Sequence, residues 1–188
     1  MDGSDTARFF RCMQVFNSIS PIGSLLEFNT ANSDLKEEGE RLVAIVAFCL
    51  NPNHYHFILR QEVDGGISEF MKRLSGGYTM YFNEKYKRSG SLFQGRFKSK
   101  HIGTDEYLKH LSAYVNLNYQ VHKFGGSTSK LTKSSWKEYS EGGIGICDKS
   151  IILDQFSNNK SSYKEFALEA LEQIKENKED VRSIEFGG

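Results

Sequence analysis

Two histidines one residue apart are the residues most able to do chemistry in this sequence. His54 and His56 flank Tyr55 in a segment typical of a β-strand, and alternate residues of a strand project from the same face. Both imidazoles are therefore presented to one point, where they can hold a divalent metal ion. Phe57 and Leu59 share the face of Tyr55, so we expect these three side chains in the core. A histidine pair with a purely structural role is the alternative.

A helix further along the chain carries the second set of candidate residues. Thr104 is typical of a helix N-cap, and the helix is expected to run from Asp105 to about His122. Tyr114 and Asn118 lie one turn apart on it. A tyrosine hydroxyl and an amide oxygen at this spacing can complete a site begun by two histidines. The alternative is a core tyrosine with its hydroxyl at the rim.

The helical wheel of this segment predicts which sides are buried. Leu108, Leu111 and Val115 form a narrow apolar stripe that we expect to face a sheet. Tyr114 and Asn118 lie on the shoulder of this stripe. Solvent is expected to cover the side that carries Lys109, Ser112 and Asn116.

Length and composition indicate one globular domain, with at most a short appendage. The 188 residues are 38% hydrophobic and 13% aromatic, enough to bury a core. No apolar run approaches the roughly 18 residues of a membrane span, and no leader-like segment opens the chain. The three cysteines are far apart and form no Cys-x-x-Cys pair, which argues against disulfides and zinc ribbons and favours a reducing cytoplasm.

The net charge is zero, but the charge is segregated. Residues 70–101 contain eight lysine or arginine residues and a single acidic residue, Glu84, interleaved with aromatic residues. Such a segment suits a polyanion with stackable bases; a solvated helix face with its aromatic residues in the core is the alternative. The candidate contacts to such a polyanion are Arg73, Lys85, Lys87, Arg88, Arg96, Lys98 and Lys100, and the candidate stacking residues are Tyr78, Tyr81, Phe82, Tyr86, Phe93 and Phe97.

The remaining elements predict an α+β fold, with helices on one face of an antiparallel sheet. The apolar segment 42–50 is typical of an interior strand, whose antiparallel partner contains the histidine pair and ends near Gln61. Helices are expected over 6–18, over 67–86 with a kink near Gly76-Gly77, and over 162–178; residues 29–40 are expected to form a polar loop, and 96–102 a short strand or extended basic segment.

Several of these segments together resemble a known family. His54-Tyr55-His56 is similar to the HUH motif, and residues 75–83 and 88–99, with Leu92-Phe93-Gln94-Gly95-Arg96-Phe97, resemble the signature of the HUH single-tyrosine transposases. Residues 113–118 match that family's nucleophile helix, and the REP-associated tyrosine transposase branch is the most similar. The resemblance spans about residues 8–124. It implies a ferredoxin-like antiparallel sheet, a catalytic domain over 1–124, and a C-terminal loop and helical appendage over 125–188.

The resemblance also implies a reaction. Tyr114 would attack a phosphodiester of single-stranded or hairpin DNA and leave a 5′-phosphotyrosine link, which a second DNA end can reverse. His54, His56 and Asn118 would hold Mg²⁺ or Mn²⁺. The protein would act as a monomer or homodimer, without ATP and without a membrane.

The sequence departs from this family in two places. Asn118-Tyr119-Gln120-Val121 stands where the family commonly has Asn-Pro-Val-Arg, although the ligand position is kept. The first predicted element is a helix, so either the native chain starts upstream of this sequence or the family's N-terminal strand is missing. The neighbouring strands would then need other partners. Two alternatives stay open: a non-cleaving, DNA-hairpin-binding remnant of such a transposase, and a replication-initiation HUH nuclease.

Overall fold

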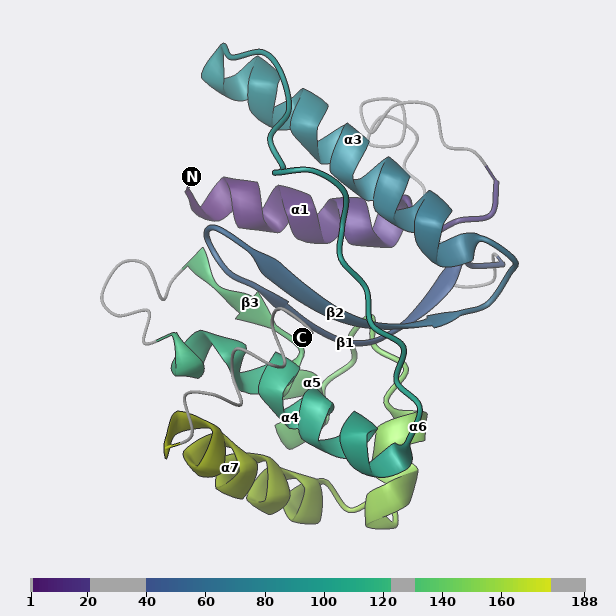
Figure 1. The fold of residues 1–188 in the computed structure, drawn as a ribbon, viewed down its shortest axis with the longest axis vertical. Helices are drawn as coiled ribbons and strands as arrows, with labels where there is room; N and C mark the ends of the chain where they lie inside the picture. The colour runs from purple at the N-terminus through teal and green to yellow at the C-terminus, as the bar shows by residue number, and fades with distance from the viewer. Residues whose placement is uncertain (1, 21–39, 123–130, 177–188) are drawn as a thin grey trace. The chain divides into compact units, whose positions relative to one another are not determined.

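The computed structural model describes residues 2–20, 40–122 and 131–176, which form a mixed α+β fold (Figure 1). Its three-stranded antiparallel sheet has the order β2-β1-β3. The strands are β1 (Val43–Leu50), β2 (Tyr55–Gln61) and β3 (Lys133–Ser134). The predicted fold class and the interior strand are confirmed.

The helices follow most of the predicted positions. Among the described residues they are α1 (Gly3–Val15), α3 (Gly66–Tyr86), α4 (Asp105–Val121), α5 (Trp136–Ser140), α6 (Ser150–Leu153), the 3-10 helix η2 (Asp154–Phe156) and α7 (Lys160–Glu176). Residues 96–102 form neither helix nor strand. The first described element is α1, and no strand precedes it in the part of the chain that the structure describes. Most of the predicted polar loop, 29–40, lies outside the described residues.

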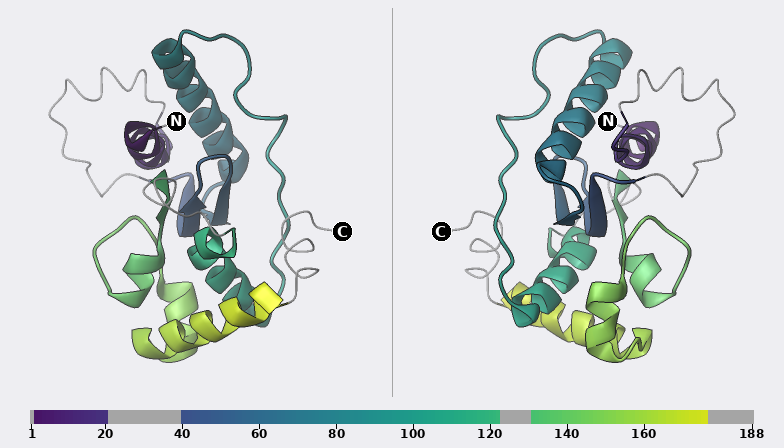
Figure 2. Two further views of the ribbon diagram at one scale, coloured as in Figure 1. Left: turned by 90° about the vertical axis from the view of Figure 1, so that its left-hand side faces the viewer. Right: turned by 90° about the vertical axis from the view of Figure 1, so that its right-hand side faces the viewer.

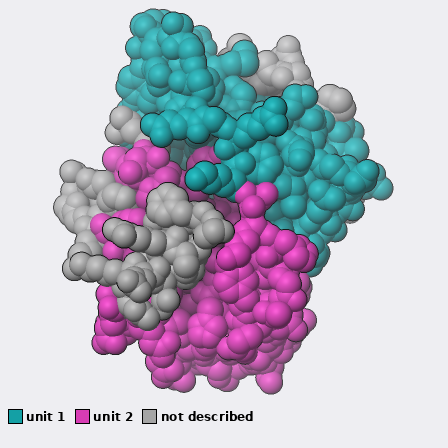
Figure 3. All heavy atoms as spheres, viewed as in Figure 1, with its two compact units in different colours: residues 1–44, 59–98 teal, residues 45–58, 99–188 magenta. Residues whose placement is uncertain are grey.

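The chain divides into two compact units, coloured separately in Figure 3. Unit 1 comprises residues 1–44 and 59–98, and unit 2 comprises residues 45–58 and 99–188. Unit 1 therefore contains α1 and α3, and unit 2 contains α4 and the elements that follow it.

In unit 1, α1 packs against α3 where two glycines were expected to kink the helix. The kink prediction is wrong, because α3 continues as regular helix through Gly76 and Gly77. A Cβ atom on Gly77 would lie 2.4 Å from the Phe16 ring. This glycine therefore serves close packing of the ring against the helix rather than a break in it.

A buried carboxylate joins the start of α1 to the end of α3, also in unit 1. Asp5 is fully buried, and its carboxylate accepts hydrogen bonds from Lys85 Nζ at 2.7 Å, the Tyr86 hydroxyl at 2.7 Å and the Tyr81 hydroxyl at 3.1 Å. Although burial favours the neutral acid, these donors hold the pKa of Asp5 below its ordinary value. The Asp2 backbone N–H also donates to Asp5, within a capping box at the start of α1.

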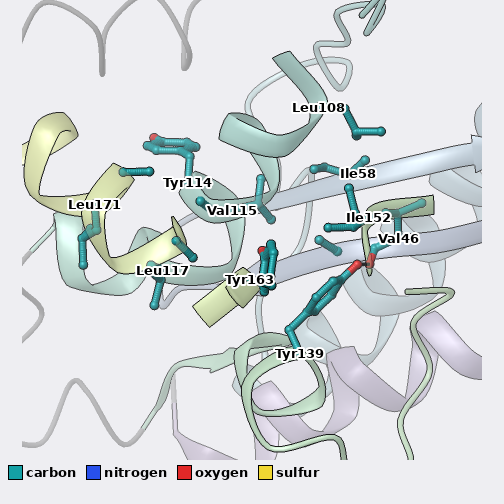
Figure 4. Close-up of a cluster of buried hydrophobic side chains, with 14 of the residues drawn as sticks. Val46, Ile58, Leu108, Tyr114, Val115, Leu117, Tyr139, Ile152, Tyr163 and Leu171 are labelled. Atoms are coloured by element: carbon teal, nitrogen blue, oxygen red, sulfur yellow. Dashed lines mark hydrogen bonds between the residues drawn. The ribbon is translucent and has the colours of Figure 1, made fainter. Parts of the chain in front are cut away.

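In unit 2, α7 lies alongside α4, as the views of Figures 1 and 2 agree. The core between them contains Tyr114 and Leu117 of α4 and Tyr163 and Leu171 of α7, drawn together in Figure 4. Burial on this scale contributes roughly 1.5–3 kcal/mol for each large apolar side chain. The C-terminal segment is thus part of the core of unit 2.

Residues of the C-terminal segment also satisfy backbone groups of β1 within unit 2. β3 pairs with β1 at Cys49 and Leu50. Ser135 accepts from the Phe48 N–H through its Oγ at 2.9 Å and donates its own N–H to the Phe48 carbonyl at 3.0 Å. The Tyr139 hydroxyl donates to the Val46 carbonyl at 2.8 Å. These contacts supply partners to a buried strand, whose backbone groups would otherwise be costly to leave unpaired.

The face of β2 opposite the histidines is only partly covered. The rings of Tyr55 and Phe57 lie side by side, with centroids 5.1 Å apart, as period-two alternation predicts. Both residues are half-buried, whereas Ile58 is 3% exposed. The expectation that Tyr55, Phe57 and Leu59 are core residues is therefore wrong in degree, since none of the three is fully buried.

Candidate metal and nucleophile site

The histidine pair lies where a tight turn enters β2. The Asn51 backbone N–H donates to the His54 carbonyl at 2.9 Å and closes the turn between β1 and β2. His54 immediately precedes the first residue of β2, and His56 is its second residue. Their ring centroids are 5.1 Å apart, at an interplanar angle of 81°. The two imidazoles therefore lie on one side of the strand, as the sequence predicts.

Helix α4 brings Tyr114 and Asn118 to the same place within unit 2. The Thr104 hydroxyl accepts from the Tyr107 N–H at 3.2 Å, which confirms the predicted N-cap. The Tyr114 ring lies edge-on to the His56 ring, with centroids 5.6 Å apart. Asn118 Oδ1 lies 3.3 Å from His54 Nε2. The four residues predicted for the site, far apart in the sequence, are thus brought together.

Asn51, which the sequence did not single out, lies between two of the candidate ligand atoms. Its Nδ2 donates to Asn118 Oδ1 at 2.6 Å and lies 2.9 Å from His54 Nε2. Asn51 and Asn118 are both buried. Lone pairs of both candidate ligands are therefore directed at one positively polarised NH2 group, as they would be at a cation. Nitrogen and oxygen donors of this kind suit a divalent metal ion, so the residues present fit one.

A third histidine, also missed by the sequence analysis, joins the pair. His122 caps the C-terminal end of α4, and its ring centroid lies 4.8 Å from that of His54. One ligand atom from each of His54, His56 and His122 lies within 4.8 Å of the others, close enough to hold a metal ion. The available signal was the spacing of four residues between Asn118 and His122, which places both on one side of a helix.

Tyr114 is more deeply buried than its predicted place on the shoulder of the apolar stripe suggests. Its side chain is 1% exposed and belongs to the core of unit 2 (Figure 4). A reaction at its hydroxyl therefore requires that oxygen to become accessible to the substrate.

The side of α4 expected to face solvent is buried as well. Ser112 and Asn116 are 0% exposed. Asn116 Nδ2 donates to the Tyr163 hydroxyl of α7 at 2.8 Å, and Ser112 Oγ lies 3.1 Å from the same oxygen. Ser135 Oγ donates to Asn116 Oδ1 at 2.5 Å. The solvent prediction for Ser112 and Asn116 is wrong, because α7 covers this side of α4 and gives the polar atoms partners.

Residues 33–118 match the family model of IS200-like transposases. The chain is similar to a transposase family. The matched segment contains His54, His56, Tyr114 and Asn118 and stops before His122 and the C-terminal helices. No match is found among curated proteins, and none among solved structures. Among the described residues, no helix is long and apolar enough to cross a membrane.

The basic residues expected to contact the DNA of such a transposase fall into two groups. Arg73 is paired with Glu69 at 2.7 Å and donates to the Ser18 carbonyl, and Lys85 is paired with Asp5. These two side chains have structural contacts in unit 1. The other five are exposed: Lys87, Arg88, Arg96, Lys98 and Lys100.

The aromatic residues of the basic segment divide in the same way. Tyr78 is 3% exposed, and the Tyr81 and Tyr86 hydroxyls are bonded to Asp5, so these rings have roles in the fold of unit 1. Phe82 and Phe93 are half-buried. Phe97 and Tyr86 are each 40% exposed, but only Tyr86 is tied to Asp5 through a hydroxyl.

Proposed function

We propose that this protein is a metal-dependent transposase that nicks and rejoins single-stranded DNA through a 5′-phosphotyrosine at Tyr114. The observation that carries the proposal is the convergence of Tyr114 and Asn118 with His54 and His56 in one compact unit. The similarity of residues 33–118 to IS200-like transposases supports the same reaction class. Similarity to the REP-associated branch in particular remains our proposal from the sequence.

The proposed reaction exchanges one phosphodiester for another. The Tyr114 phenolic oxygen loses its proton and attacks the scissile phosphorus. A bond forms between that oxygen and phosphorus, the bond from phosphorus to the 3′-oxygen breaks, and the departing 3′-oxygen takes up a proton. Because the phosphotyrosine is itself an ester, a second 3′-hydroxyl can attack it and restore Tyr114. No nucleoside triphosphate is required.

Three residues are proposed to hold the divalent ion, Mg²⁺ or Mn²⁺: His54, His56 and Asn118. A bound ion would polarise the scissile phosphate and offset negative charge in the transition state. Asn51 holds Asn118 Oδ1 directed toward His54, which keeps the amide oxygen oriented for this role.

We infer that Tyr114 acts with the histidines of its own chain. Tyr114 and His56 are already in ring contact without a second chain. The Tyr163 hydroxyl contacts Ser112 and Asn116, which precede and follow Tyr114 by two residues in α4. The segment 125–188 would then support the nucleophile helix rather than form a separate module, with residues 1–124 supplying the catalytic groups.

Single-stranded or hairpin DNA is the proposed partner. Five exposed basic residues would contact phosphates. Four belong to unit 1 and one to unit 2: Lys87, Arg88, Arg96 and Lys98, and Lys100. Phe97 would stack on an unpaired base.

A denaturing gel with fluorescent hairpin oligonucleotides and Mn²⁺ tests the proposal. We expect a protein–DNA adduct with the wild type and with Tyr119→Phe, a control on the same helix, and none with Tyr114→Phe. The burial of Tyr114 favours one second candidate, a DNA-hairpin-binding protein that does not cut. That candidate would show tight hairpin binding by fluorescence anisotropy and no adduct with any variant.

A further inference from the structure

Three imidazoles, rather than two, converge on the candidate metal site. We propose that His122 is a third imidazole ligand, beside His54, His56 and Asn118, and that it makes the site select Mn²⁺ over Mg²⁺. This inference rests on the proposed metal-dependent function. His122 lies beyond the segment that matches the transposase family, so the family match does not assign it a role.

The spacing of the three histidines suits one ion. Their ligand atoms lie within 4.8 Å of one another. Metal–nitrogen bonds of about 2.1 Å separate the ligands of one ion by roughly 3–4.2 Å, so small side-chain rotations are enough to close the set. His122 is placed for this by helix geometry, since it follows Asn118 by one turn of α4. The ligands therefore come from two elements of unit 2, the start of β2 and the end of α4.

The hydrogen bonds around His54 orient it as a metal ligand. Its Nδ1 lies 2.8 Å from Asn53 Oδ1. An amide oxygen only accepts hydrogen bonds, so a proton on Nδ1 satisfies Asn53, and the shorter contact of Nε2 is to the amide donor Asn51 Nδ2 rather than to Asn118 Oδ1, which leaves Nε2 as the acceptor. This Nε2 points to Asn51 Nδ2 and Asn118 Oδ1, at the centre of the cluster. A histidine that donates its other ring N–H to an oxygen is the common arrangement around bound metals.

The third imidazole changes which metal the site prefers. Mg²⁺ favours oxygen ligands and gives up its water reluctantly, whereas imidazole suits transition metals. Two histidines with one amide oxygen leave room for either ion. Three histidines shift the balance toward Mn²⁺, with Co²⁺ as a useful spectroscopic probe.

Titration of the full chain with Mn²⁺ in the absence of DNA, followed by the electron paramagnetic resonance signal of free Mn²⁺, tests the proposal. His122→Ala is expected to raise the Kd for Mn²⁺ at least about tenfold. The matched control is His110→Ala, which removes an exposed imidazole from the same helix that pairs with Glu106. His110→Ala should leave the Kd unchanged. Mg²⁺ should displace Mn²⁺ from the wild type only at a large excess, and from His122→Asp at a concentration at least about tenfold lower.

Each outcome decides the matter. An unchanged Kd in folded His122→Ala, or a wild type that binds Mg²⁺ as tightly as Mn²⁺, overturns the role of His122. If His122→Ala does not fold, the Mg²⁺ competition of His122→Asp and of the wild type gives the answer. The adduct gel separates failure of this inference from failure of the proposed function. If the wild type forms adduct and His122→Ala binds Mn²⁺ unchanged, only the role of His122 is wrong. If the wild type forms no adduct and binds no Mn²⁺, both proposals are wrong.

Discussion

The Tyr114 ring lies edge-on to the imidazole of His56, with ring centroids 5.6 Å apart and planes at 74°. The proposed nucleophile and a proposed metal ligand are thus neighbours within one chain and one compact unit. Two expectations follow from this contact: the tyrosine can reach a phosphate held at the histidines of its own chain, and loss of either residue inactivates that chain completely.

Mixing two inactive variants tests the same-chain arrangement. Tyr114→Phe and His56→Ala should each form no adduct, and their equimolar mixture should also form none, because neither chain carries both groups. If tyrosines served the histidines of a partner, half of the dimers in the mixture would be mixed and each would have one complete site of two, so adduct would return to about a quarter of the wild-type yield. Denaturing gels of the mixture, beside the wild type diluted with each variant, provide the measurement.

Tyr163→Phe should destabilise unit 2 and slow adduct formation. The change removes the hydroxyl that accepts from Asn116 Nδ2 and contacts Ser112 Oγ, and leaves those buried atoms without this partner. The expected cost is about 1–3 kcal/mol in the free energy of unfolding. Urea unfolding followed by circular dichroism measures it. Tyr119→Phe, which loses a half-buried hydroxyl bonded to the neighbouring Gln120, is the control, and equal midpoints for the two variants would contradict the role of Tyr163.

Burial also raises the pKa of Tyr163 to about 12. The folded state therefore binds this proton more tightly than the unfolded chain, in which a tyrosine titrates near pH 10. Stability from this group is complete below about pH 10 and declines as the pH rises toward 12. Between about pH 10 and pH 12, the difference in free energy of unfolding between the wild type and Tyr163→Phe should therefore become smaller.

Asp5→Asn should remove an acid-sensitive part of the stability of unit 1. The pKa of Asp5 is lowered in the folded state, so its contribution is present above about pH 4 and is lost as the pH falls through the folded pKa. At pH 7 we expect a loss of about 2 kcal/mol, because Lys85, Tyr81 and Tyr86 lose a charged acceptor. Urea unfolding at pH 7 and pH 3 should show this difference shrinking in acid.

The matched control for that experiment is Asp64→Asn, in the exposed turn before α3. It should change the free energy of unfolding by no more than about 0.5 kcal/mol at either pH. A pH-independent deficit of Asp5→Asn would show that packing, rather than the charge of Asp5, joins α1 to α3.

Two arginines of unit 1 should respond differently to alanine substitution. Arg96 is exposed, so Arg96→Ala should leave the unfolding midpoint unchanged and lower the salt dependence of single-strand binding by about 0.7 in log K against log salt. Arg73 is bonded to Glu69 and to the Ser18 carbonyl, so Arg73→Ala should cost about 1 kcal/mol of stability. Fluorescence anisotropy over a salt series gives the slope. A larger slope change for Arg73→Ala than for Arg96→Ala would reverse our assignment.

Local signals in the sequence were enough to predict β1 and β2, whereas β3 was not predicted. The apolar run 42–50, the Thr104 cap and the alternation of His54 and His56 each depend on neighbouring residues, and the structure confirms all three. The approach of Tyr114 to the histidine strand is a contact between distant segments, and it was expected only because the family resemblance implied it.

The features that were missed depend on contacts between distant segments. Ser112 and Asn116 have solvent-compatible side chains, and only the position of α7 determines that they are buried. Gly77 has the sequence signal of a helix break, but the Phe16 ring needs the space that a Cβ would fill. His122 stood at the expected end of its helix, and its approach to His54 follows from how α4 lies against the start of β2 within unit 2.

The most direct test of the central claim is to map the DNA-linked residue by mass spectrometry. Wild-type protein is incubated with a hairpin oligonucleotide and Mn²⁺, digested with nuclease and protease, and searched for tyrosine peptides that carry a nucleotide. Fragment spectra locate the nucleotide within each peptide, and we predict it on Tyr114 and on no other tyrosine. A nucleotide on Tyr107 or Tyr119, or bound DNA with no modified peptide, would contradict the proposed nucleophile.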